Sequence, residues 1–168
     1  MKNGNMQTMK DGDIIDFVVD FDGTCTTHDF PRVGKEIGAA PVLKRLTDKG
    51  HRLILFTMRC DHKEMNWEDP IDKSINSYAK NHLTQAVEWF KKNDIPLYGI
   101  QTNPTQAQWT TSPKAFGHLI IDDIALGAPL RFDRELSNAP FIDWAAVEAM
   151  LEEYGILDVT LDGEKIKF

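Results

Sequence analysis

The chain has 168 residues, of which 42% are hydrophobic and 27% charged, a balance typical of one soluble globular domain and not of a disordered or fibrous protein. Its formal net charge of -7 at pH 7 disfavours a nucleic-acid partner, because a phosphate backbone would be repelled. No stretch approaches the roughly 20 apolar residues of a membrane-spanning helix, and the polar start, Met1 to Asp13, lacks the apolar segment of a signal peptide. We therefore expect a single domain, residues 1–168, in the cytoplasm, with neither nucleic acid nor a membrane as partner.

Four short apolar runs, rich in Ile, Leu and Val, have the length of buried strands and cover residues 14–19, 52–56, 96–101 and 118–121. A helix is predicted between the first two runs, from Ala40 to the end signal Lys49-Gly50. A second helix is predicted between the next two runs, because apolar residues recur there at helical spacing: Leu83, Ala86, Val87 and Phe90. Alternating strands and helices predict an α/β fold, a Rossmann-like three-layer sandwich with a mostly parallel central sheet and a core at about 14–130.

The C-terminal part, residues 140–168, is expected to add a helix and a short hairpin. Asp143 is a candidate N-cap, and the apolar stripe that follows it ends before Gly155. The pair Asp162-Gly163 is a favoured two-residue hairpin turn. The longest excursion is the charged stretch 61–80, which we interpret as a surface loop or a small flap.

Polar residues follow the predicted strands at the edge where α/β proteins bind ligands. The first strand is followed by Asp20, Asp22 and Gly23. Thr57 and Arg59 follow the second strand, Asp122 and Asp123 follow the fourth, and Lys114 stands in the loop before it. Four aspartates in one cleft would raise each other's pKa values unless a cation lay between them. Magnesium suits such a site, because it takes oxygen ligands and is commonly shared between carboxylates and a phosphate.

These residues resemble the motifs of the haloacid dehalogenase superfamily of phosphohydrolases, in that family's order. Its DxDGT signature matches residues 20–24, its Thr or Ser after the second strand matches Thr57, its Lys matches Lys114, and its acidic pair matches Asp122-Asp123. One such motif alone would be a weak signal. The ordered set of four, each next to a predicted strand end, is a strong one.

The resemblance implies a Mg²⁺-dependent phosphatase that hydrolyses a phosphomonoester through an aspartyl phosphate on Asp20. Asp22 is then the general acid and general base, while Thr57 and Lys114 hold phosphate oxygens. The metal ligands implied are Asp20, the backbone carbonyl of Asp22, and Asp123, with Asp122 closely associated; which of the acidic pair ligates directly stays open. Relatives that cleave carbon–halogen bonds lack the second aspartate, so dehalogenation is not expected.

Residues next to these motifs are candidates for contact with the substrate. They are Arg59, Gly23 and Met58. Arg59 would point to the same side as Thr57 if the strand continued, and the alternative is a surface ion pair. His28 is a further residue that could line the cleft, although an ordinary loop histidine is the simpler interpretation.

Three other functions compete with the phosphatase. An EF-hand loop starting at Asp20 would need a glycine and a glutamate where Cys25 and Pro31 stand. A receiver-like signalling domain has its acidic pair before the phosphoacceptor, which is the reverse of the order found here. A catalytically inactive binding protein of the same fold stays open.

The spacing of the motifs also bears on the substrate. Neither gap between them has room for a cap domain, so the chain resembles the capless members, in which a bulky substrate enters or a neighbouring subunit supplies the lid. We therefore expect a phosphorylated substrate of unknown identity and a possible homo-oligomer.

Overall fold

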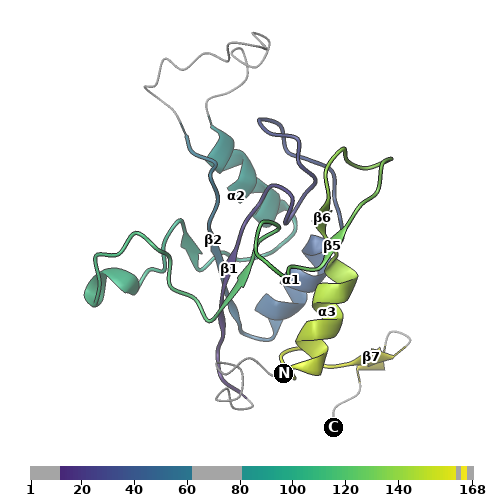
Figure 1. The fold of residues 1–168 in the computed structure, drawn as a ribbon. Coiled ribbons are helices and arrows are strands. Elements are labelled where there is room, and N and C mark those ends of the chain that lie inside the picture. Colours follow the sequence, from purple (N-terminus) through teal and green to yellow (C-terminus); the bar gives the residue numbers. More distant parts are fainter. Residues whose placement is uncertain (1–11, 62–80, 162–163, 166–168) are drawn as a thin grey trace.

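The computed structural model describes residues 12–61, 81–161 and 164–165, and its centre is a four-stranded sheet (Figure 1). The strands are β1 (Asp16–Val19), β2 (Arg52–Leu55), β3 (Gly99–Ile100) and β4 (Leu119–Ile121), in the spatial order β3-β2-β1-β4. Every pairing between them is parallel. The predicted α/β fold with a mostly parallel sheet is therefore confirmed. All four predicted apolar runs contain a strand, each shorter than its run.

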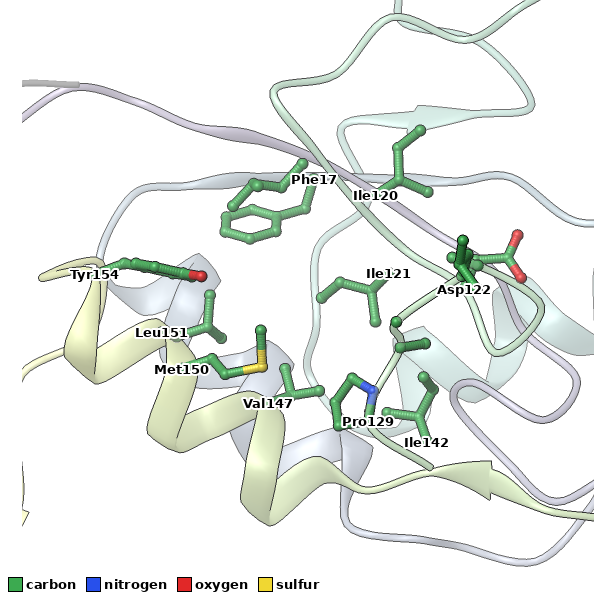
Figure 2. Close-up of a pocket in the computed structure, with 15 residues that line it drawn as sticks. Phe17, Ile120, Ile121, Asp122, Pro129, Ile142, Val147, Met150, Leu151 and Tyr154 are labelled. Atoms are coloured by element: carbon green, nitrogen blue, oxygen red, sulfur yellow. The ribbon is translucent and has the colours of Figure 1, made fainter. Parts of the chain in front are cut away.

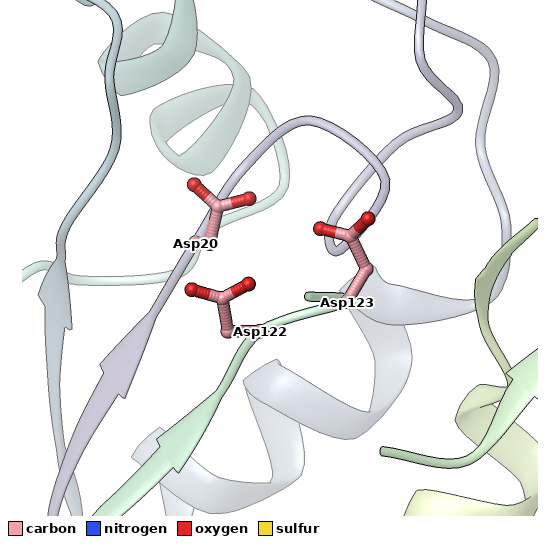
Figure 3. Close-up of side chains that lie close together, drawn as sticks. All are labelled: Asp20, Asp122 and Asp123. Carbon is pink, nitrogen blue, oxygen red and sulfur yellow. The ribbon is translucent and has the colours of Figure 1, made fainter. Parts of the chain in front are cut away.

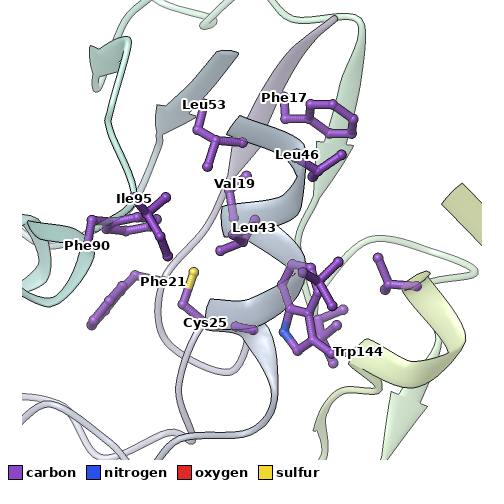
Figure 4. Packing of buried hydrophobic residues seen from close by; sticks show 14 of the residues in the cluster. Phe17, Val19, Phe21, Cys25, Leu43, Leu46, Leu53, Phe90, Ile95 and Trp144 are labelled. Carbon is purple, nitrogen blue, oxygen red and sulfur yellow. The ribbon is translucent and has the colours of Figure 1, made fainter. Parts of the chain in front are cut away.

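Three helices pack against one face of this sheet. They are α1 (Ala39–Asp48), α2 (His82–Lys92) and α3 (Trp144–Glu153). In β1 the residues that face them are Phe17 and Val19, which pack with Leu43 of α1 and Phe90 of α2 in the main core (Figure 4). Right-handed crossovers explain why α1 and α2 share a face, since both connections step in the same direction along the sheet.

The opposite face is covered by the connection from β3 back to β4, residues 101–118. This connection crosses the sheet in the reverse direction, so a right-handed crossover places it on the other face. Its Ala115 packs with Val18 and Ile54 in a second, smaller core. The connection contains a short 3-10 helix, Gln106–Gln108, and lies apart from the α-helices in Figure 1. This face is therefore covered by an irregular segment, whereas the other face is covered by α-helices.

The C-terminal part follows the sequence prediction. Two short antiparallel strands, β5 (Leu130–Arg131) and β6 (Phe141–Ile142), lead into α3. The carboxylate of Asp143 accepts a hydrogen bond from the backbone N–H of Ala146, which confirms Asp143 as the N-cap. The strands of the predicted hairpin are β7 (Thr160–Leu161) and β8 (Glu164–Lys165), while its turn lies outside the described residues.

Two further expectations concern membrane-spanning helices and the charged stretch 61–80. Of the helices in the described ranges, none has the length and apolar character needed to cross a membrane. The excursion 61–80 lies outside the described residues from position 62 on. Its interpretation as a surface loop or flap therefore stays a prediction.

Candidate metal centre

Three carboxylates converge at the carboxyl ends of two neighbouring strands. Asp20 directly follows β1, whereas Asp122 and Asp123 directly follow β4. Because β1 and β4 are parallel neighbours, the residues that follow them meet at the same edge of the sheet. One oxygen of each side chain lies within 4.8 Å of the other two, and Figure 3 shows the three carboxylates facing a common space.

The crowding of acids changes the proton affinity of Asp20. Its pKa is raised from 3.8 to about 7, chiefly by burial, with the negative charges of Asp122, Asp123 and Asp22 adding to the effect. Near neutral pH the carboxyl group of Asp20 would therefore be partly protonated. A cation between the three carboxylates would offset this repulsion. Because all three groups offer oxygen atoms, the cluster fits a hard metal ion.

Thr24 joins the two halves of the cluster. Its hydroxyl oxygen lies 3.3 Å from Oδ2 of Asp20 and 3.4 Å from Oδ1 of Asp123. The same oxygen accepts a hydrogen bond of 3.1 Å from the backbone N–H of Asp123. Thr24 is fully buried, and its hydroxyl links the loop after β1 to the loop after β4.

The side chain of Asp22 is turned toward Arg59. The guanidinium donates from Nε to Oδ2 at 2.6 Å and from Nη2 to Oδ1 at 2.7 Å. Arg59 is only 1% exposed, and it also donates to the backbone carbonyls of Pro31 and Arg32. The expected alternative of a surface ion pair is therefore corrected: the pair is real, but the arginine is buried. Direct contact of Arg59 with a substrate stays a prediction.

Thr57 lies at the end of β2 and is held through its backbone. Its N–H donates to Oε1 of Gln101, and its carbonyl accepts from Nε2 of the same side chain. The Thr57 hydroxyl accepts a hydrogen bond from the backbone N–H of Arg59. The neighbouring Met58 is 96% exposed. The predicted roles of Thr57 in phosphate binding and of Met58 in substrate contact stay predictions.

Lys114 lies in the connection between β3 and β4 that covers the second face of the sheet. It stands directly before Ala115, which packs against Val18, and its own side chain is exposed. No hydrogen bond or ion pair joins its ammonium group to another residue of the described part. The predicted contact of Lys114 with a phosphate stays a prediction.

Gly23 occupies a turn that other residues would strain. Its φ of +81° is in the left-handed region. A Cβ atom at this position would lie 2.2 Å from Nε2 of His28 and 2.8 Å from Cγ of Asp123. The glycine therefore leaves room for these two side chains, and its predicted contact with a substrate stays a prediction.

An apolar cavity of about 210 Å³ lies on the outer side of β4. Its walls come from β4, from the loop after β4 and from α3, and include Ile121, Met150 and Tyr154 (Figure 2). Asp122 is at its rim, with its carboxylate directed away from the cavity in this view. The cavity thus shares Asp122 with the candidate metal centre, while its other walls are largely apolar.

Two residues of the site, Thr24 and His28, carry more than the sequence indicates. Thr24 is part of the DxDGT motif but has no predicted role of its own, and an ordinary loop histidine is the simpler interpretation of His28. In the structure Nε2 of His28 lies 3.0 Å from Oδ2 of Asp123. The position of His28 shortly after the acidic motif indicates that its ring could lie near the site. The sequence does not indicate that the ring contacts Asp123.

Comparisons with known proteins support the fold. No protein-family model matches the chain, and no curated protein matches it either. Among solved structures, the chain is similar to a protein of Bacteroides thetaiotaomicron described as a conserved protein, with 27% sequence identity and a TM-score of 0.58. The match covers 84% of this chain and 92% of that one. It supports the α/β architecture, and the description of that protein names no activity.

Proposed function

We propose that this protein is a Mg²⁺-dependent phosphatase that hydrolyses a phosphomonoester, as its resemblance to the haloacid dehalogenase superfamily implies. The observation that carries the proposal is the convergence of Asp20, Asp122 and Asp123 at one edge of the sheet, within 4.8 Å of one another. Such a cluster suits a divalent cation, and a cation at the carboxyl ends of parallel strands is well placed to receive a phosphate.

Asp20 is the proposed nucleophile. Its carboxylate oxygen attacks phosphorus, the bond from phosphorus to the ester oxygen breaks, and the alcohol leaves with a proton. Water then attacks the aspartyl phosphate, which releases inorganic phosphate and restores the carboxylate. Asp22, two residues further on, is the proposed partner for the protons that move in these two steps. To take up a proton, its carboxyl group has to turn away from the guanidinium of Arg59, which donates to both of its oxygens in the structure.

The proposed metal ligands are Asp20, the backbone carbonyl of Asp22, and Asp123, with Asp122 beside them. A bound Mg²⁺ ion would supply positive charge that offsets the repulsion between the aspartates and an incoming phosphate. Thr57 and Lys114 are proposed to bind the remaining phosphate oxygens, as donor and as point charge respectively.

Phosphate release from p-nitrophenyl phosphate, measured with purified protein and Mg²⁺, tests the proposal. We expect turnover that chelation abolishes and that Mg²⁺ restores. A panel of phosphate esters should follow, covering sugar phosphates, nucleotides and phosphopeptides, because the sequence and the fold name no particular alcohol.

Asp20→Asn is the decisive variant, because an amide is a poor nucleophile and changes the fold little. It should lose measurable turnover. Near-native turnover in this variant would contradict the assignment of Asp20. No turnover by the unchanged protein on any ester, together with intact Mg²⁺ binding, would instead favour a catalytically inactive binding protein.

A further inference from the structure

His28 contacts the metal centre from the loop after β1. Its Nε2 lies 3.0 Å from Oδ2 of Asp123. A carboxylate only accepts hydrogen bonds, so the histidine donates and Nε2 carries the hydrogen. The side chain of Asp123 is 10% exposed, while that of His28 is 39% exposed. The ring therefore closes the outer side of a nearly buried carboxylate.

The two oxygens of Asp123 have different surroundings. Oδ2 meets His28, while Oδ1 lies 3.4 Å from the hydroxyl of Thr24, on the side of Asp20. The hydroxyl of Thr24 has only one hydrogen to donate, and it lies 3.3 Å from a carboxylate oxygen of Asp20 as well. Asp20 and Asp123 therefore compete for this one donor. The shorter contact to His28 is the better candidate for fixing the rotation of the carboxylate.

The turn at Gly23 accommodates this arrangement. The ideal Cβ position at Gly23 lies 2.5 Å from Cε1 of His28, closer than side chains come to one another. Any other residue there would displace the ring or the carboxylate. The glycine of the motif thus permits the contact between His28 and Asp123.

We propose that His28 is a positioning residue of the metal centre, which holds Oδ2 of Asp123 so that Oδ1 faces the cation. The proposal rests on the metal site of the proposed function and adds a residue that the motifs do not contain. Groups that orient metal ligands by hydrogen bonds typically change metal affinity by about 10- to 100-fold when they are removed. His28 is exposed, so its removal opens no core cavity, and the effect should appear in metal binding more than in folding.

Titration calorimetry with Mg²⁺ in the absence of substrate tests the proposal. We expect His28→Ala to weaken Mg²⁺ binding by about 10- to 100-fold. His28→Gln, whose amide also donates from a comparable position, should stay within about threefold of the unchanged protein, a free-energy difference below 1 kcal/mol. His28→Phe keeps a ring but lacks a donor, and it should resemble His28→Ala.

His118→Ala is the matched control. His118 precedes β4, the strand that ends at Asp122 and Asp123, and its Nδ1 accepts from the backbone of Asp16 at the far end of the sheet. This variant should alter stability without altering Mg²⁺ affinity. Equal losses of affinity in His118→Ala and His28→Ala would show general loosening and overturn the proposal.

The remaining outcomes separate the inference from the proposed function. Native Mg²⁺ affinity in His28→Ala and His28→Phe overturns the inference alone, and so does a loss in His28→Gln as large as that in His28→Ala. No Mg²⁺ binding by the unchanged protein overturns both the metal site and the inference. Mg²⁺ binding that depends on His28, without hydrolysis of any ester, supports the inference while the phosphatase proposal fails.

Discussion

Asp22 and Arg59 form a two-pronged ion pair, with Nε to Oδ2 at 2.6 Å and Nη2 to Oδ1 at 2.7 Å. The guanidinium also lies over the rings of Phe21 and Phe30, 5.0 Å and 5.3 Å from their centroids. With the carbonyls of Pro31 and Arg32 as further acceptors, the buried cation is surrounded by partners. Arg59 thus joins the loop 30–32, the end of β2 and Asp22 in one structural unit.

Breaking this pair should destabilise the protein, because the carboxylate of Asp22, whose side chain is only 19% exposed, would lose its partner. We expect Arg59→Met to lower the free energy of unfolding by about 1–3 kcal/mol, the cost of a partly buried charged group that loses its hydrogen-bond donors. Urea denaturation of the metal-free protein measures this loss. The double variant Arg59→Met, Asp22→Asn should be less destabilised than the sum of the two single variants, since it leaves no uncompensated charge. Strict additivity would contradict a direct interaction.

The burial of Arg59 also shows where sequence reasoning ends. The strands, their order along the chain and the carboxylates at their ends were predictable, because apolar runs and the polar residues that follow them are local patterns. The meeting of Arg59 with Asp22, 37 residues away in sequence, depends on how two loops pack at the sheet edge. No local periodicity contains that information. For the same reason the sequence could not reveal that His28 would meet Asp123.

The connection from β3 to β4 is a second feature that the sequence does not predict. Residues 101–118 connect two parallel strands, a role that a helix usually fills. This segment instead uses side-chain to backbone bonds: Nε2 of Gln106 donates to the carbonyls of Ser112 and Lys114. Such irregular segments have no repeating pattern. The sequence therefore predicts that Lys114 lies in the loop before a strand, but it does not predict the path of that loop.

Asp20 makes the stability of the metal-free protein depend on pH. Its pKa is about 7 in the folded state, against 3.8 for an unperturbed aspartate, so the folded state binds the proton more tightly than the unfolded chain. Between these values the unfolded state holds fewer protons than the folded state, and the free energy of unfolding falls as pH rises. Above about pH 7 the loss is complete. Each unit of pKa difference corresponds to about 1.4 kcal/mol. Because Asp20 is partly in contact with solvent, which screens the effect, we expect the free energy of unfolding to fall by only on the order of 1–3 kcal/mol.

Urea denaturation between about pH 4.5 and 8, on either side of the raised pKa, checks this dependence in the presence of a chelator. Asp20→Asn should flatten the curve, because the amide does not titrate. Mg²⁺ should also flatten it, by offsetting the repulsion among the aspartates. A stability that rises through this range in the unchanged protein, and not in Asp20→Asn, would contradict the raised pKa.

Lys114→Ala tests the predicted phosphate contact. Val18 and Asp20 share a face of β1 if the strand continues, and Lys114 stands beside Ala115, which packs against Val18. If its ammonium group reaches the phosphate, turnover should fall by on the order of 10²-fold, comparable to the loss of one preorganised electrostatic contact. Lys35→Ala is the control, because Nζ of Lys35 donates to the carbonyl of Glu135. If turnover falls by less than about threefold in Lys114→Ala, which corresponds to less than 1 kcal/mol, the predicted phosphate contact is wrong and Lys114 is an ordinary surface lysine.

Asp22→Asn removes the charged partner of the buried Arg59, so urea denaturation first checks that the variant is folded. In the folded protein it should separate the two proton transfers of the proposed reaction. As general acid, Asp22 matters most for a strongly basic alkoxide and little for a stable phenolate such as p-nitrophenolate. As general base it matters for every ester, because water attacks the same aspartyl phosphate whichever alcohol has left. The variant should therefore give a first-turnover burst with an aryl phosphate and then stall as phosphoenzyme accumulates on Asp20. With an alkyl phosphate the burst itself should be slow.

Rapid-quench measurement of both esters checks this, and equal slowing of the first turnover on each would show that Asp22 is not the acid.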